Sequence, residues 1–397
     1  MASPFNVPNE FVQGLIKSGE SWWQAMAVSP PWLGMTAAPP ERSDRRFSGA
    51  QWHDNPAYSL LKQGYLFNAR LIAGMVEGAV LDEPAKHRLR FYTQQFIDSM
   101  SPANFAATNP DVQSLALETN GRSLQAGFAN LLADLRKGGL TITDETAFEI
   151  GTNVAVSEGS VVFENELFQL IQYAPHSAKV ATRPLLIVPP CINKFYILDL
   201  QPDNSFVRYA VEQGHTVFLV SWRNPDPKVP SCGLVTWDDY LEQGVMEAIE
   251  VALAISGADK LNALGWCVGG TIVASALAVL RARGDTSVAS LTLLTTMLDF
   301  QDPGDLGVFI DEQGVAQREQ AIGEGGIYPG AELGFVFQTL RANDLIWPNV
   351  INNYLKGKSP EAFDLLYWNA DGTNLPGPMY AWYLRFWMLS RLKNSKA

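Results

Sequence analysis

The chain has 397 residues, 47% of them hydrophobic, so it is long enough to bury a large core. Its formal net charge of -12 argues against a sequence-independent nucleic-acid binder, which needs a clustered positive field. The most apolar helical pattern, residues 271–280, is soon followed by Arg281 and Arg283, well short of the roughly 18 apolar residues of a membrane span. The opening MASPFNVPNE and three cysteines, an odd number, favour a reducing, cytosolic location.

Two segments with different patterns precede the first strands. Residues 1–46 mix tryptophans with prolines and a charged ERSDRR cluster, which predicts a weakly ordered lead-in. Residues 47–157 are expected to form a helical N-terminal module, because apolar residues recur there at helical spacing. Asp82-Glu83-Pro84 and Ser101-Pro102 have the composition of helix starts.

Residues 158–300 show the alternation of strands and helices that is typical of an α/β protein. The sequence GSVVFENELFQLIQYAP, residues 159–175, predicts a hairpin. The apolar runs RPLLIVPP, TVFLVSW, KLNALGW and SLTLLTTML then alternate with helical patterns over residues 204–212, 239–255 and after Cys267. Buried strands separated by helices predict a parallel-rich sheet covered on both faces.

Residues 301–397 lose this alternation and are rich in glycine, proline and aromatic residues, ending near YAWYLRFWML. We expect them to form a cap or lid over the core. An aromatic cap is suited to contact with an apolar phase, because tryptophan and tyrosine combine large apolar rings with a polar edge.

The strongest chemical motif is Gly265-Trp266-Cys267-Val268-Gly269, between an apolar strand and an alanine-rich helix. This pattern predicts a nucleophile elbow, a sharp strand-to-helix turn in which Gly265 and Gly269 allow neighbouring backbones to approach closely. The sulfur of Cys267 then lies at a helix N-terminus, which is expected to lower its pKa. The structural alternative is a buried free cysteine in a tight strand–helix contact.

Two backbone N–H groups are candidate donors to an oxyanion. One belongs to Val268, directly after the nucleophile, and the other to Ile192, in the loop PPCINK that follows an earlier strand. A cysteine in this place keeps a transferred acyl group activated as a thioester, whereas a serine would hold it as an ordinary ester. The motif therefore favours a transferase over a plain esterase.

Several segments closely resemble class I polyhydroxyalkanoate synthases: PPCINKFYILDLQPDNSFVRYAVEQGHTVFLVSWRNPD, WDDY, GWCVGGT, LTTMLDF and DGTNLPGPMYAWYLR. The resemblance covers nearly all of the chain, and the family's N-terminal signature is expected to run on to about residue 220. It implies an α/β-hydrolase fold and polymerisation of (R)-3-hydroxyacyl-CoA, mainly 3-hydroxybutyryl-CoA, into polyester.

The resemblance also implies the site and the partners. Cys267 matches the family nucleophile, and Asp199 matches an aspartate associated with efficient synthesis that is also suited to holding its loop in place. Coenzyme A is part of the substrate and is released, so no cofactor and no metal are expected. The implied partners are the surface of cytoplasmic polyester granules and a second copy of the chain in a homodimer, with no nucleic acid and no transmembrane segment.

The order of the chemical groups departs from that family. In α/β-hydrolases the acid and the histidine follow the nucleophile, yet all four histidines here precede Cys267. The family's acid and histidine lie beyond the segment matching NLPGPMYAWYLR, so we expect a chain truncated before them, missing the C-terminal part of the core and weakly active or inactive. The candidate substitutes for the missing acid and histidine are His53, His87, His176, His215, Asp299, Asp302 and Asp305.

Two other functions remain open at this point. A thioesterase or lipase-like hydrolase would use the same elbow but needs an open site that water can enter. A non-catalytic granule-surface or dimerisation partner would use the N-terminal helices and the aromatic cap without turnover, and the absence of a histidine after Cys267 favours that alternative.

Overall fold

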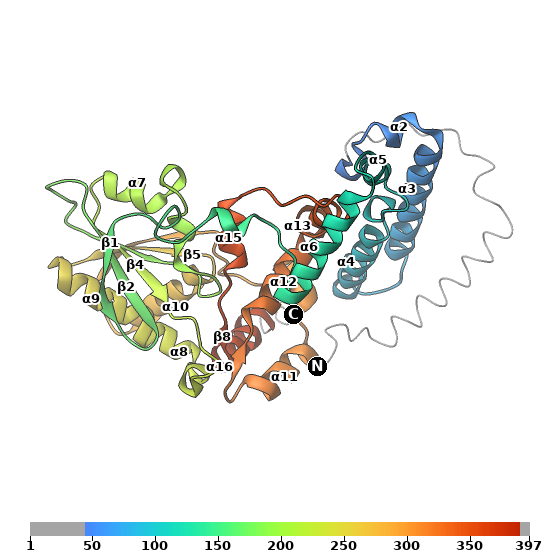
Figure 1. Cartoon of the computed structure of the whole chain (residues 1–397). Coiled ribbons are helices and arrows are strands. Elements are labelled where there is room, and N and C mark those ends of the chain that lie inside the picture. The colour runs from blue at the N-terminus through green and yellow to red at the C-terminus, as the bar shows by residue number, and fades with distance from the viewer. Residues whose placement is uncertain (1–43, 390–397) are drawn as a thin grey trace. The chain divides into compact units, whose positions relative to one another are not determined.

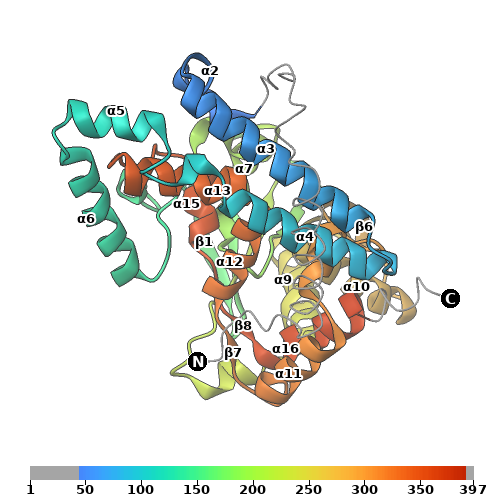
Figure 2. The same ribbon diagram turned by 90° about the vertical axis from the view of Figure 1, so that its right-hand side faces the viewer.

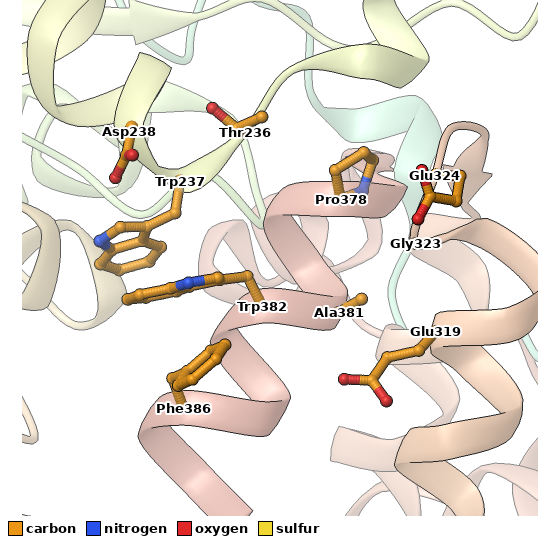
Figure 3. A pocket seen from close by; sticks show the side chains of 10 residues that line it. All are labelled: Thr236, Trp237, Asp238, Glu319, Gly323, Glu324, Pro378, Ala381, Trp382 and Phe386. Carbon is orange, nitrogen blue, oxygen red and sulfur yellow. The ribbon is translucent and has the colours of Figure 1, made fainter.

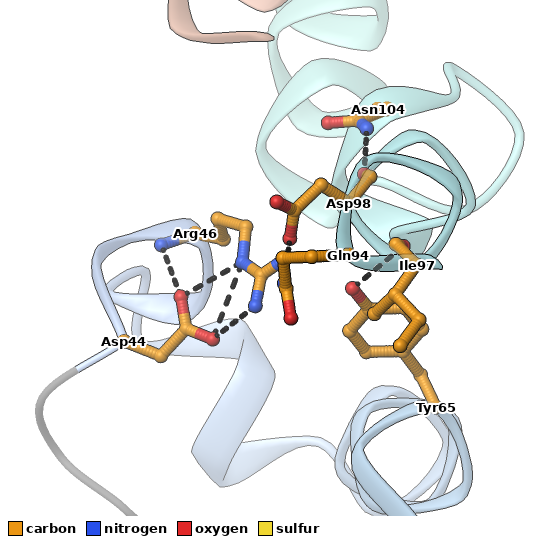
Figure 4. A network of polar contacts seen from close by, with 7 residues as sticks. All are labelled: Asp44, Arg46, Tyr65, Gln94, Ile97, Asp98 and Asn104. Carbon is orange, nitrogen blue, oxygen red and sulfur yellow. Dashed lines mark hydrogen bonds and ion pairs between the residues drawn. The ribbon is translucent and has the colours of Figure 1, made fainter. Parts of the chain in front are cut away.

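The computed structural model of the chain describes residues 44–389. The chain divides into two compact units, residues 1–50 and 51–397, and each is described by itself. In the first unit, Asp44 caps the short 3-10 helix η2 (Arg45–Phe47), and its carboxylate forms a 2.8 Å ion pair with Arg46 (Figure 4). The predicted lead-in over residues 1–46 lies almost wholly outside the described residues.

The second unit begins with a group of helices (Figure 1). They are α2 (Gln51–Asp54), α3 (Pro56–Glu77), α4 (Glu83–Ser99), the 3-10 helix η3 (Pro102–Asn104), α5 (Pro110–Glu118) and α6 (Arg122–Lys137). Asp82 caps α4 as predicted, its side chain accepting a hydrogen bond from an N–H of the first turn. The expected start at Ser101 opens only one 3-10 turn, because Ser101 makes no such bond, and Asn109 caps the next α-helix instead.

Polar contacts join α3, α4 and η3 (Figure 4). The Tyr65 hydroxyl donates to the Ile97 carbonyl oxygen at 2.9 Å, and the Asn104 amide donates to the Asp98 carbonyl oxygen at 2.8 Å. Gln94 donates to the Asp98 carboxylate, also at 2.9 Å. The bonds from Tyr65 and Asn104 add partners to carbonyl groups at the end of α4, where a helix leaves its last carbonyls without intrahelical donors.

The central sheet has six strands in the order β1-β2-β4-β3-β5-β6. Their bounds are β1 (Gly159–Glu164), β2 (Phe168–Tyr173), β3 (Leu185–Val188), β4 (Val217–Trp222), β5 (Leu261–Trp266) and β6 (Val288–Leu294). β1, β2 and β4 pair antiparallel, whereas β4, β3, β5 and β6 pair parallel. The predicted hairpin and the parallel-rich sheet are therefore confirmed, and β1 and β6 form the two edges of this sheet.

Apolar clusters cover both faces of the sheet, which explains why its central strands are continuous apolar runs. Leu186 and Val188 of β3 belong to a cluster with α9 (Glu247–Ser256) and α10 (Val268–Ala282). Ile187, which points the other way, belongs to a second cluster with α7 (Phe206–Glu212). The region predicted as one helix over 239–255 is instead α8 (Trp237–Asp239), the π-helix η8 (Tyr240–Met246) and α9.

The C-terminal region consists of short helices and one small two-stranded sheet. These elements are η9 (Gly304–Phe309), α11 (Glu312–Ile322), β7 (Ile327–Tyr328), α12 (Gly330–Leu340), α13 (Ala342–Leu345), α14 (Trp347–Asn349), η10 (Val350–Leu355), α15 (Asp364–Ala370), β8 (Leu375–Pro376), α16 (Gly377–Trp382) and the π-helix η11 (Tyr383–Leu389). α11 packs along α16 (Figure 2). The predicted domain boundaries after residues 46, 157 and 300 stay predictions. Within residues 44–389, every helix is too short or too polar to cross a membrane.

Candidate active site

Cys267 occupies the turn between β5 and α10 in a strained backbone conformation. Its φ of 52° and ψ of -129° lie in a region that residues other than glycine rarely adopt. The Cys267 N–H donates to the Leu294 carbonyl oxygen of the neighbouring strand at 2.9 Å. A strained residue in a strand-to-helix turn, held by a hydrogen bond to the neighbouring strand, is typical of a nucleophile elbow. The turn places the thiol of Cys267 at the carboxyl end of β5.

The glycines on either side of Cys267 make this turn sterically possible. A Cβ on Gly269 would lie 2.4 Å from the carbonyl oxygens of both Val188 and Pro189, at the end of β3. A Cβ on Gly265 would lie 2.4 Å from the Cα of Gly270. The first turn of α10 therefore packs directly on the backbone of β3 and β5, and no larger residue fits either position without moving the turn.

The thiol of Cys267 is half-buried, and this changes its acidity in the direction opposite to that expected from the helix N-terminus. Burial raises the pKa of the Cys267 thiol above its ordinary value, while a hydrogen bond from the Val268 N–H lowers it by a smaller amount. Burial is thus the larger effect, because a thiolate loses more hydration here than a single N–H restores. The sequence-based expectation of a lowered pKa was wrong.

The loop after β3 lies beside the elbow and contains Ile192. The indole N–H of Trp222 donates to the Pro189 carbonyl oxygen at 2.9 Å, and the Thr373 N–H donates to the Ile192 carbonyl oxygen at 3.0 Å. These bonds hold the loop from both sides. The roles of the Val268 and Ile192 N–H groups as oxyanion donors stay predictions, and the fixed loop supports them, since an oxyanion hole needs donors that do not reorganise.

Sequence analysis missed Tyr383 as a residue of the site. Burial raises the pKa of its phenol, and nearby Cys267 and Cys191 raise it further, so the hydroxyl stays protonated and lies within the field of both sulfurs. Its ring stacks on Trp237 and meets Phe300 edge-on. The string YAWYLRFWML marks this segment as aromatic, but only helix packing decides which ring comes within the field of the thiol.

Cys191 lies near Cys267 but is a poor second nucleophile. Its side chain is 2% exposed, and burial raises the pKa of its thiol to about 12. A thiol with such a pKa is almost entirely protonated at neutral pH.

Asp199 is held by polar contacts within its own region of the chain. Its carboxylate accepts hydrogen bonds from the hydroxyls of Ser157 and Ser205 at 2.6 and 2.5 Å, and Ser205 caps α7. The side chain of Asp199 is only 2% exposed. Burial raises the pKa of Tyr173, and the charge of Asp199 raises it further. These contacts favour support of the local backbone over direct contact with an acyl group, and this role stays a prediction.

Five of the seven candidate substitutes for a base or acid have other partners. His87 Nε2 lies 2.8 Å from the Asp305 carboxylate, and His53 Nδ1 lies 3.2 Å from Lys62 Nζ. Asp299 and Asp302 accept hydrogen bonds from backbone N–H groups two residues further along, so both stabilise turns. The other two candidates are the exposed His176 and the half-buried His215. None of the contacts described here involves the thiol of Cys267.

Two family models match the chain. "Poly-beta-hydroxybutyrate polymerase (PhaC) N-terminus" matches residues 43–210, and "alpha/beta hydrolase fold" matches residues 184–392. The second match spans the elbow and most of the C-terminal region.

Similar full-length proteins extend the likeness over nearly the whole chain. "Poly(3-hydroxyalkanoate) polymerase subunit PhaC" of Cupriavidus necator is 54% identical over 378 residues, covering 94% of this chain and 63% of the relative. "Poly(3-hydroxyalkanoate) polymerase" of Methylorubrum extorquens is 42% identical, covering 95% and 64%. "Poly(3-hydroxyalkanoate) polymerase 2" of Ectopseudomonas oleovorans is also 42% identical, covering 91% and 64%. The chain therefore spans less than two thirds of the length of these relatives.

Proposed function

The chain belongs to the poly(3-hydroxyalkanoate) polymerase family, with an α/β-hydrolase core, and we propose that it is an acyltransferase whose nucleophile is Cys267. The proposed substrate is a 3-hydroxyacyl-CoA, with 3-hydroxybutyryl-CoA as the main member. The observation that carries the proposal is the strained elbow, which presents the thiol of Cys267 beside the Val268 N–H.

The first step is exchange of one thioester for another. The sulfur of Cys267 attacks the thioester carbonyl, the Val268 and Ile192 N–H groups stabilise the oxyanion, and the carbon–sulfur bond to coenzyme A breaks. The thiol proton of Cys267 ends on the sulfur of the released coenzyme A. Because a thioester is lost and another is formed, the step is nearly isoenergetic and the acyl group stays activated.

The second step forms the ester. The 3-hydroxyl of another hydroxyacyl group attacks the acyl-Cys267 thioester, its proton passes to the sulfur, and the thiol is regenerated. The Tyr383 phenol, which interacts electrostatically with the Cys267 sulfur, packs against Trp237 and Phe300, and these apolar rings favour acceptance of an alcohol over water. This surrounding supports a transferase over a hydrolase.

The first experiment is mass spectrometry of the intact chain and its peptides after incubation with 3-hydroxybutyryl-CoA. We expect an acyl adduct to form slowly on the peptide containing Cys267, with release of coenzyme A, because no histidine within residues 44–389 contacts its thiol to take the proton. Cys267→Ala should lose the adduct, and Cys191→Ala should keep it, because the Cys191 thiol is buried and protonated. An adduct on Cys191 or Cys232 alone would overturn the assignment.

The proposal includes partners and a location that rest on the family. The chain is proposed to form a homodimer and to act at the surface of polyester granules in the cytoplasm. Sedimentation equilibrium tests the dimer, and co-sedimentation with washed polyester granules tests surface binding. A monomer at micromolar concentration, or a chain that stays in the supernatant, would contradict the respective part.

A further inference from the structure

A cleft of about 460 Å³ lies where α8, α11 and the continuous α16–η11 segment meet. Figure 3 shows the rings of Trp237, Trp382 and Phe386 on one side of it and the carboxylates of Glu319 and Glu324 across from them. A volume of this size is within the range of small-molecule sites. Among the residues that line the cleft, only Trp237 also belongs to the aromatic surroundings proposed for the transfer steps at Cys267.

The aromatic side of the cleft is a stack of three rings. The centroids of Trp237 and Trp382 are 5.2 Å apart with planes 19° from parallel, and Trp382 and Phe386 follow at 5.1 Å and 33°. Trp237 is only 3% exposed, whereas Trp382 is 36% and Phe386 55% exposed. The two outer rings therefore offer apolar surface to a ligand, while the inner ring anchors them in the core.

The inner ring also connects the cleft with the nucleophile. Trp237 stacks on Tyr383 as well, with centroids 5.6 Å apart, and the Tyr383 phenol lies within the field of the Cys267 sulfur. Trp237 is therefore shared by the ring stack of the cleft and by the phenol near the nucleophile.

The charges of the cleft disfavour an anionic ligand. Arg385 forms ion pairs with Glu319 and Glu312, which neutralises part of the acidic side. The carboxylates of Asp238 and Glu324 also line the cleft. The several phosphate charges of a coenzyme A ester would be repelled here, whereas an uncharged ester would not be.

A hydrogen-bond donor on the aromatic side favours an ester over an organic cation. Within residues 44–389, no protein group accepts a hydrogen bond from the indole N–H of Trp382, and its ring is partly exposed. An ester carbonyl is such an acceptor. A quaternary ammonium ion would use the ring faces and the carboxylates but offers no acceptor to this N–H, which would then bind only water.

We propose that the cleft between α8, α11 and α16–η11 binds an uncharged hydroxyalkanoate ester segment, the part of the acyl chain that has moved away from Cys267. Its methylene and methyl groups pack on Trp382 and Phe386, and an ester carbonyl accepts a hydrogen bond from the Trp382 indole. The proposal rests on the proposed acyl transfer for the origin of the ligand, but not for the binding itself.

The test is isothermal titration calorimetry of the whole chain with the methyl ester of a linear 3-hydroxybutyrate trimer. Trp382→Ala is expected to weaken binding at least about tenfold, and Trp382→Phe, which keeps a ring but lacks the indole N–H, about three- to tenfold. The matched control is Phe335→Ala on α12, since Phe335 is 49% exposed and lies outside the cleft. It should bind like the unchanged chain, and circular dichroism checks the folding of each variant.

Three outcomes would overturn the proposal. The first is that the chain fails to bind the trimer ester, and the second is that all variants bind it equally. The third outcome is that tetramethylammonium or coenzyme A, and not the ester, binds in a way that depends on Trp382. Cys267→Ala separates this proposal from the function, because it should lose acylation and still bind the trimer ester. Acylation of Cys267 without trimer binding contradicts the cleft proposal alone. Trimer binding without acylation contradicts the proposed function alone.

Discussion

The phenol ring of Tyr383 lies almost flat on the indole of Trp237, with planes only 17° from parallel. Tyr383 is the first residue of the π-helix η11, where the regular turn of α16 widens. The stack fixes the ring while the raised pKa keeps the hydroxyl protonated near the Cys267 sulfur. A neutral phenol in this place can donate a hydrogen bond to a thiolate or to an acyl oxygen but cannot act as a base.

We predict that the Tyr383 hydroxyl donates a hydrogen bond to the Cys267 thiolate once the thiolate forms. Tyr383→Phe should then slow alkylation of Cys267 by iodoacetamide about two- to tenfold at pH 8. Peptide mass spectrometry measures the rate at that residue. Tyr380→Phe is the matched control, because Tyr380 lies one turn earlier and stacks on Tyr328 with centroids 4.2 Å apart. Equal rates in Tyr383→Phe and the unchanged chain would remove the phenol from the site.

The pH dependence of the same reaction tests the effect of burial on Cys267. Because its pKa is raised in the folded chain, the fraction of thiolate at pH 7 is smaller than for an unperturbed thiol. Alkylation should be slower than that of free cysteine at pH 7 and should keep rising beyond the pH at which free cysteine reaches its plateau. A midpoint below that of free cysteine would show that the helix N-terminus outweighs burial.

Cys191 provides an internal comparison in that experiment. Its thiol has a pKa of about 12, so the neutral form is favoured by folding at all pH values up to about 12. The stability that this preference contributes is fully present below the ordinary thiol pKa and is lost as the pH rises toward 12. We expect Cys191 to remain unmodified at pH 9 in the native chain and to react fully in urea.

Gly269→Ala should destabilise the elbow strongly. The added Cβ would lie 2.4 Å from two backbone oxygens, and backbone atoms cannot move aside as a flexible side chain can. The expected loss is about 3 kcal/mol or more in the free energy of unfolding, measured by urea denaturation. Gly64→Ala in α3 is the control, because a Cβ added at Gly64 meets nothing within 4 Å. This substitution should stabilise the helix by about 0.5–1 kcal/mol.

Asp199→Ala distinguishes support of the backbone from a part in acyl transfer. Removing the carboxylate leaves the hydroxyls of Ser157 and Ser205 without their acceptor, so unfolding should become easier by about 2–3 kcal/mol. Ser157→Ala, which removes one donor and keeps the charge, should cost less. If Asp199→Ala abolished acylation of Cys267 without lowering stability, the aspartate would belong to the chemistry.

Local patterns in the sequence determined the parts of the structure that depend on neighbouring residues. The alternation in residues 159–175 predicted the hairpin, the apolar runs predicted the central strands, and the glycines around Cys267 predicted the elbow. Strand periodicity and close backbone approach are properties of a few consecutive residues, so the sequence records them directly. Ile192 was also identified from its position after a strand, although its donor role awaits a test.

Packing between distant segments decided the remaining features. The sequence marked residues 380–389 as aromatic, but only the fold places Tyr383 toward the thiol and Trp382 in the cleft. Packing also raises the pKa of Cys267, where the sequence predicted a lower pKa, because the hydration that a thiol loses depends on everything packed around it. The direction of a side chain on a helix follows from the local sequence. The residue that it meets across the core comes from more than 100 residues away, so that contact is set by the tertiary structure alone.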